Sequence, residues 1–172
     1  MTSVAFSGMG PGLFFEQETA QFEVNQSTIL VNADGVARKT AIEFGDVVLL
    51  ELVGTSYEKV TLAGTAAASL PSQLVGVALE AANHGETVRV GLRGEFQCKA
   101  LNTSVNRGDE VVCSQALGGT GYGTLTDPGD VPAADPAVYH KLVGVAQETS
   151  GAAGAIITVF FDGITGIMGT HN

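Results

Sequence analysis

The stretch Leu-Val-Gly-Val-Ala-Leu-Glu at residues 74–80 recurs almost unchanged at residues 142–148, as Leu-Val-Gly-Val-Ala-Gln-Glu. Six of the seven positions are identical. Short runs rich in β-branched residues are typical of strands, so each copy predicts one strand. The glycine in the middle of each copy predicts either a β-bulge or a close approach of another backbone or side chain over the strand.

The residues around each copy follow the same order. A Gly-Asp pair stands upstream of both, at Gly45-Asp46 and at Gly108-Asp109, and a strand-like run follows each pair. Glycine adopts backbone conformations closed to other residues, and aspartate accepts hydrogen bonds from the amides of its own turn. A Gly-containing turn and another apolar run follow both copies. The order predicts two similar units, at about residues 41–100 and 104–162.

Strand signals continue along the chain, whereas helical spacing of apolar residues is nearly absent. The pattern predicts an all-β sandwich or barrel shared by the two units, because neither unit alone would bury both faces of its strands. The expected strands are Gln21–Asn25, Thr28–Val31, Val47–Val53, Lys59–Ala63, Leu74–Glu80, Thr87–Leu92, Glu95–Lys99, Glu110–Ser114, Gly123–Thr126, Leu142–Gln147 and Ala155–Phe161.

Two tails flank the β domain of residues 38–162. Residues 163–172 are expected to form an arm or a frayed end. Residues 1–37 contain a Gly- and Pro-rich hinge and then exposed aromatics, which suits an extended arm that contacts a neighbouring subunit. The alternative is that this arm folds back as an edge strand of its own domain. The side chains expected to contact the capsid or a neighbour are Leu13, Phe14, Phe15 and Phe22.

The composition bears on the choice of partners. The 172 residues include 18 acidic and 8 basic ones, for a net charge of −10, which disfavours nucleic acid and anionic membranes. Charged residues make up only 15% of the chain, well under the usual quarter, and this deficit indicates a surface covered by partner subunits. The alternative is a compact, glycine-rich β protein with short turns. The chain has neither a membrane-spanning apolar run nor a signal-peptide pattern, so we expect it to be made in a cytoplasm.

Residues capable of catalysis or metal binding are scattered. The chain has no P-loop and no Gly-x-Ser-x-Gly motif, and its histidines, at positions 84, 140 and 171, fall in unrelated segments. Asp127, Asp130 and Asp135 do not have calcium-loop spacing and are expected to be solvated turn residues. Cys98 and Cys113 are expected to be reduced thiols, with a disulfide left open. We therefore expect no cofactor, no metal and no enzymatic activity.

The ordered set of Gly-Asp turns and Leu-Val-Gly-Val-Ala strands resembles a family of small tailed-phage proteins encoded among head genes. These proteins are often labelled predicted recombinases and are better understood as capsid decoration, or cement, proteins. The resemblance covers about residues 38–162, and its most specific part is Leu74–Ala100 followed by the second Gly-Asp turn. A recombinase would need a nucleotide-binding loop, which this sequence lacks.

The resemblance implies a small β-barrel or β-tulip-like fold and assembly, commonly as homotrimers, on the outer face of the virion capsid. The implied partners are the major capsid protein and other copies of the chain, reached through the N-terminal arm. Such a protein stabilises the shell across capsomer joints. The alternatives are a tail, fibre or receptor-binding β module, although the chain has no Trp and three Tyr, and a small enzyme on a β-barrel.

Overall fold

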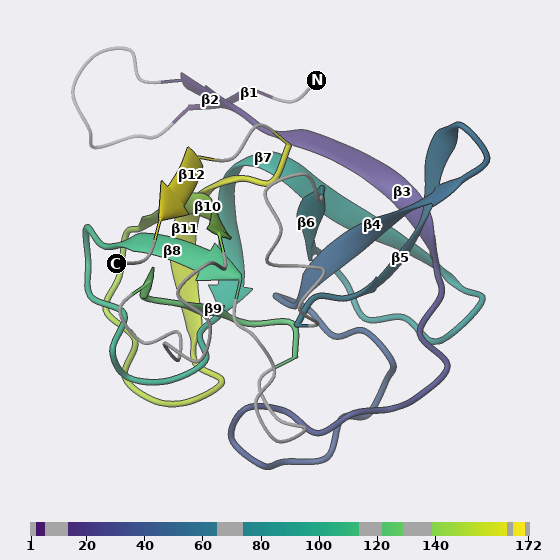
Figure 1. The fold of residues 1–172 in the computed structure, drawn as a ribbon, viewed down its shortest axis with the longest axis horizontal. Coiled ribbons are helices and arrows are strands. Elements are labelled where there is room, and N and C mark those ends of the chain that lie inside the picture. The colour runs from purple at the N-terminus through teal and green to yellow at the C-terminus, as the bar shows by residue number, and fades with distance from the viewer. Residues whose placement is uncertain are drawn as a thin grey trace.

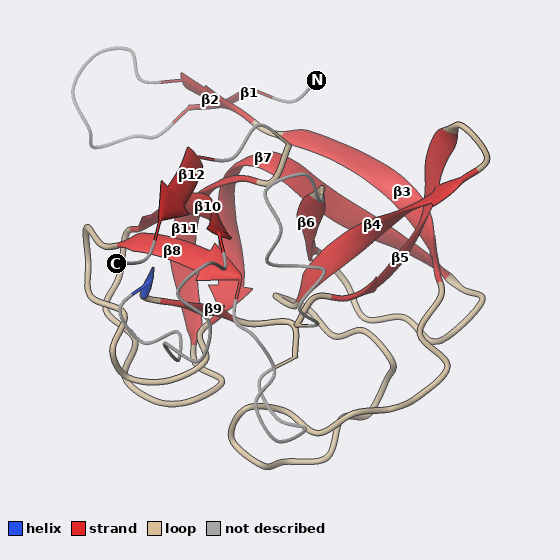
Figure 2. Cartoon of the chain, viewed as in Figure 1, coloured by secondary structure: helices blue, strands red, loops and turns tan. Residues whose placement is uncertain are grey.

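The computed structural model describes residues 3–5, 14–64, 74–113, 122–128, 139–164 and 167–170. Their regular structure consists of β-strands (Figure 2), and none of these residues lies in an α-helix, since the short helical segment drawn after β9 is a 3-10 turn at Pro128; this confirms the all-β prediction. The strands are β1 (Ser3–Ala5), β2 (Phe14–Glu16), β3 (Glu18–Val24), β4 (Val47–Val53), β5 (Ser56–Leu62), β6 (Val75–Ala78), β7 (Thr87–Lys99), β8 (Glu110–Cys113), β9 (Leu125–Thr126), β10 (Tyr139–Ala146), β11 (Ile156–Asp162) and β12 (Ile167–Thr170).

Five of the described strands close a barrel, in the order β3-β5-β4-β6-β7 and back to β3 (Figure 1). The ring closes because β3 pairs with two strands at once, antiparallel to β7 at Phe22–Val88 and parallel to β5 at Glu23–Lys59. Alternate side chains point inward and form an apolar core. Its buried members are Phe22, Val24, Ala41, Ile42, Val48, Leu50, Val60, Leu62, Ala78, Ala82, Val88 and Val90.

The other strands extend from the far half of β7, in the order β11-β10-β8-β9, and β12 pairs with β10. A parallel bridge between Ala100 and Leu125 brings β9 back to the end of β7. The long strand β7 is therefore common to both halves of the molecule. The core beneath the second half consists of Val47, Ala63, Val75, Val77, Phe96, Cys98, Ala100, Val105, Val111, Cys113, Leu125, Val143, Ala146, Ile157, Val159 and Phe161.

The two predicted units share their hydrogen bonds as well as their order. In the first unit, Gly45 N donates to Ala78 O at 2.9 Å and Ala78 N donates to Asp46 O at 2.8 Å. In the second unit the matching pairs are Gly108 N to Ala146 O at 2.8 Å and Ala146 N to Asp109 O at 2.9 Å. The glycine of each turn has a positive φ, +80° and +93°, which other residues rarely adopt. The prediction of two similar Gly-Asp-turn units is thus confirmed.

The equivalence begins earlier in the chain than the sequence indicated. Val24, at the end of β3, donates its amide proton to Glu86 O and accepts one from Gly85 N. Ala100, just after β7, makes the same pair of bonds with Ala155 O and Gly154 N. Strand β3 of the first unit and the far half of β7 in the second unit are therefore equivalent strands. Within the expected arm, residues 1–37, Glu18–Val24 folds back on its own domain, as the alternative has it, but it pairs on both sides and is therefore not an edge strand.

Three other segments differ from the expected strands. Thr28–Val31 lies in the connection between β3 and β4 and not in a strand. Thr87–Leu92 and Glu95–Lys99 form one continuous strand, because the intervening residues pair with β11 at Arg93–Asp162 and Gly94–Phe161. Within the expected C-terminal tail, Ile167–Thr170 forms β12, so part of that tail belongs to the sheet.

The repeated glycines make room for close approaches. A Cβ on Gly76 would collide with the side chain of Val90, and a Cβ on Gly144 would collide with the carbonyl oxygen of Phe160. The pairing of β10 with β8 also shifts register between Leu142 and Gly144. Both structural roles predicted for this glycine therefore occur.

Candidate interaction surfaces

The N-terminal residues form a hairpin outside the barrel. Strands β1 and β2 pair antiparallel with each other, Val4 opposite Phe15 and Ala5 opposite Phe14, in a sheet separate from the main one. Figure 1 shows this hairpin at one end of the molecule, where β2 leads into β3. Gln17 lies between the two strands, and its Nε2 donates to Glu95 O at 2.7 Å. The hairpin is thus fastened to β7 at its base.

The expected contact residues fall in different places. Leu13 lies outside the described residues, and Phe14 and Phe15 are in β2. Phe22 is 6% exposed, because β3 alternates and turns Phe22 and Val24 toward the core of the first barrel. Phe22 therefore fills the core of its own subunit and offers little surface to a neighbour. Contact of the other three residues with a neighbour stays a prediction.

The connection between β3 and β4 is the clearest difference between the two units. Twenty-two residues separate Val24 from Val47, whereas nine separate Ala100 from Glu110 at the equivalent place in the second unit. The longer connection is ordered by its own contacts. Asn32 N donates to Val36 O at 2.9 Å, and Val36 N donates to the Asp34 carboxylate at 2.9 Å. We call residues 25–46 the long loop.

The long loop carries an exposed apolar surface, which we call the loop surface and define by Val31, Val36, Phe44 and Ile156. All four side chains are exposed, and Val36 is the most exposed, at 59%. Ile156 of β11 adjoins the loop, since a Cβ on Gly45 would come within 2.9 Å of its Cδ1. The loop surface therefore combines residues of the first unit with one residue of the second.

A second exposed apolar group lies at the tip of the β4–β5 hairpin. Leu52, Val53 and Tyr57 are exposed there, and Leu52 pairs across the hairpin with Tyr57. Strand β4 starts beside the loop surface and ends at this tip, so the two groups occupy opposite ends of one strand (Figure 1). We call these three residues the hairpin tip.

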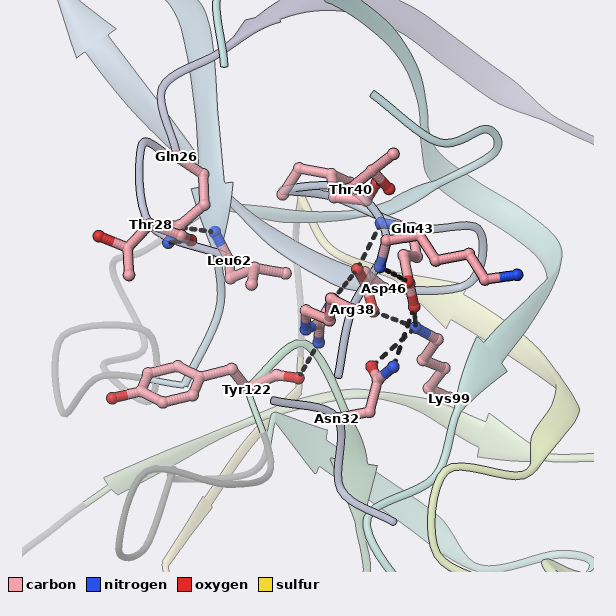
Figure 3. Close-up of polar contacts among 12 residues, drawn as sticks. Gln26, Thr28, Asn32, Arg38, Thr40, Glu43, Asp46, Leu62, Lys99 and Tyr122 are labelled. Carbon is pink, nitrogen blue, oxygen red and sulfur yellow. Dashed lines mark hydrogen bonds and ion pairs between the residues drawn. The ribbon is translucent and has the colours of Figure 1, made fainter. Parts of the chain in front are cut away.

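A buried network of charges holds the long loop against the rest of the protein (Figure 3). Arg38 and Asp46 are both buried and form an ion pair at 2.5 Å. Lys99 is the last residue of β7, and its Nζ lies 2.8 Å from Glu43 Oε2 and 2.9 Å from Asp46 Oδ1. Arg38 also donates to the carbonyl oxygen of Tyr122, in the second unit, at 2.9 Å. Two cations and two anions thus join the loop to β7 and to the second unit.

The surroundings of the two carboxyls shift their pKa values in opposite directions. Burial would raise the pKa of Glu43, but hydrogen bonds from Lys99, from the Lys39 amide and from Asn32 outweigh it and lower the pKa to about 2. Burial raises the pKa of Asp46, while the charges of Arg38 and Lys99 act against that rise. Of the two carboxyls, Glu43 is therefore the one whose charged form the surroundings favour.

The residues considered for catalysis or metal binding do not gather in the described structure. His84 is exposed in the turn before β7, and Asp127 follows β9, while Asp130 and Asp135 lie outside the described residues. Across the described ranges, no group of three or more His, Cys, Asp or Glu side chains is placed to hold a metal ion. Cys98 and Cys113 are buried in the second core, and burial raises the pKa of Cys98. No helix in the described part of the chain is long and apolar enough to cross a membrane.

Sequence reasoning missed the loop surface and the charge network. The loop surface had no clear signal, because the extra length of its loop becomes visible only once the hydrogen bonds match β3 to the far half of β7. The network had none, since Arg38, Asp46, Lys99 and Tyr122 are brought together only by the tertiary fold.

Comparisons with known proteins give likenesses in structure but not in sequence. No family model matches the chain. No curated protein matches its sequence. Among solved structures, the chain is similar to the N base of the head fiber protein gp8.5 of bacteriophage phi29, with a TM-score of 0.48 and 15% sequence identity. The alignment covers 86% of this chain and 95% of that one.

Proposed function

We propose that this protein is a decoration, or cement, protein of a tailed-phage head, which binds the outer surface of the capsid and stabilises it across capsomer joints. The observation that carries the proposal is the pair of exposed apolar groups, the loop surface and the hairpin tip, at opposite ends of β4. A cement protein must contact more than one neighbour at once. Separated apolar contacts on one rigid β body suit that task.

The sequence supports the same function. Residues 38–162 resemble the phage cement family in the order of their turns and strands. The low content of charged residues suits a surface that is largely covered after assembly, and the net charge of −10 suits a protein that stays outside the shell and does not bind the genome. The proposed partners are the major capsid protein and other copies of this chain. The proposed role is structural, not catalytic.

Adding the purified protein to capsids that lack it tests this function. We expect saturable binding, measured by co-sedimentation, and a higher temperature of capsid rupture once the sites are filled. Capsids already saturated with the protein serve as the control and should bind no more. Binding restricted to tails or to a few sites per particle would favour a fibre role, and failure to bind any phage particle would contradict a structural role.

A further inference from the structure

The long loop is an addition to a repeated unit. The two units agree hydrogen bond for hydrogen bond at their Gly-Asp turns, yet the connection before the turn has thirteen more residues in the first unit than in the second. The short connection of the second unit shows that the same Gly-Asp turn forms without the extra residues. Long connections in compact domains are usually functional. The extra residues therefore call for a role other than closing the barrel.

The added loop is held in one position. Its Arg38 and Glu43 pair with Asp46 and Lys99 in the buried network, and its Asp34 lies against Gly154 of the second unit. Buried ion pairs contribute little net stability, because removing the charges from water offsets their attraction, but they do favour one arrangement over others. A surface loop ordered before binding loses less conformational entropy when it binds.

The loop surface is also neutral in an acidic protein. Residues 26–46 together with Lys99 hold three acidic and three basic residues, so the whole net charge of −10 belongs to the remaining residues. Two copies that each carry −10 repel each other unless they meet through a region without net charge. A basic partner would instead be attracted to the acidic remainder. Neutrality and exposed apolar side chains together therefore fit a second copy of this chain.

We propose that the loop surface, with Val31, Val36, Phe44 and Ile156, is the contact through which one copy binds another. This inference rests on the proposed function, because a decorated shell is where many copies would lie side by side. The contact itself can be measured with the purified protein, without capsids. The hairpin tip, which lies beside Glu51 and Glu58, is left for a different partner.

The test is the mass of the full-length protein in solution as a function of concentration, by analytical ultracentrifugation. We expect the wild type to self-associate and Val36→Asp to weaken association by at least about tenfold, because an unpaired carboxylate would be buried in the contact. Ile156→Asp should have the same effect and tests the surface from β11, outside the long loop. Leu52→Asp is the matched control, since Leu52 is 58% exposed at the hairpin tip and Val36 is 59% exposed. Circular dichroism checks that each variant folds.

Three outcomes would overturn the inference: a wild type that stays monomeric at every concentration, association unchanged by Val36→Asp and Ile156→Asp, or equal weakening by Leu52→Asp. Capsid binding by Val36→Asp and Ile156→Asp separates this inference from the proposed function. If the variants associate normally but lose capsid binding, the loop surface faces the shell and the second copy is the wrong occupant. If association changes as expected but no capsid binds, the proposed function fails and the contact between copies stands.

Discussion

The ammonium group of Lys99 lies 2.8 Å from the carboxylate of Glu43, and this pair joins the strand shared by both halves of the molecule to the loop that is longer in the first unit. Lys99 stands at the last position of β7, and Glu43 precedes the Gly-Asp turn. The pair therefore connects the repeated framework to the part of the molecule in which the two repeats differ.

Replacing Lys99 with methionine should destabilise the protein by about 3–5 kcal/mol, because Glu43 and Asp46 would lose the cation that they share. Urea unfolding measures the change. Lys59→Met is the matched control: Lys59 pairs with Glu23 at 2.9 Å on the surface, where water screens the pair, so its loss should leave the free energy of unfolding nearly unchanged. Equal effects of the two substitutions would show that the buried network does not hold the loop.

The free energy of unfolding should fall as the pH drops from about 4.5 toward 2. The pKa of Glu43 is about 2 in the folded protein, below its ordinary value of 4.5, so its stabilisation is complete above 4.5 and is lost as the pH approaches 2. The loss for this group should be smaller than the roughly 3 kcal/mol that the pKa shift alone would give, because solvent screens part of the interaction. The raised pKa of Asp46 acts in the opposite direction and offsets part of it.

Glu43→Gln isolates this contribution, because the amide keeps the shape of the side chain without titrating. The difference in unfolding free energy between wild type and variant should shrink as the pH falls through the 4.5–2 range. A difference that stays constant over that range would contradict the assigned role of Glu43.

Gly144→Ala should lower stability by about 1–3 kcal/mol or prevent folding, because the new Cβ would meet the Phe160 carbonyl in a paired strand that cannot retreat. Gly151→Ala is the control, since no atom lies within 4 Å of its Cβ position and the change should stay within about 0.5 kcal/mol. Thermal unfolding of both variants measures the difference. A stable Gly144→Ala protein would show that the repeated glycine is not needed for close packing.

Deleting residues 1–15 should leave the fold intact and weaken capsid binding. Gln17 and strand β3 remain after this deletion, so the first barrel still closes, whereas the hairpin expected to contact a neighbour is gone. Affinity for capsids and the urea midpoint together measure the effect. Unchanged capsid affinity would rule out the arm as an anchor.

Deleting residues 1–24 should have a different result, because it also removes β3. The edges of β5 and β7 would be left unpaired and the core around Val88 would be exposed. We expect an unfolded or aggregated product. A deletion that folds as stably as wild type would contradict the closed five-stranded barrel.

The repeated segments were predictable from sequence because their signals are local. The run Val47–Val53 coincides with β4, and the Gly-Asp turns adopt the positive φ that the glycines predict. Strand β3 was harder to assign, because Glu18–Val24 carries little local sign of which strands it pairs with. Its pairing with both β5 and β7 is a property of the closed barrel.

The candidate surface was less predictable, for a physical reason. Phe22 and Phe44 are the same residue type, yet Phe22 is buried and Phe44 is exposed, and only the tertiary position of each decides this. Arg38 and Lys99 lie 61 positions apart and share Asp46, a contact that no spacing in the sequence indicates.

The most direct test of the central claim is the copy number of this protein in purified virions, measured by quantitative mass spectrometry against the major capsid protein. A cement protein spread over the whole shell predicts a ratio near one to one. A few copies per particle would indicate a tail or fibre component, and absence from the particle would contradict the structural role altogether.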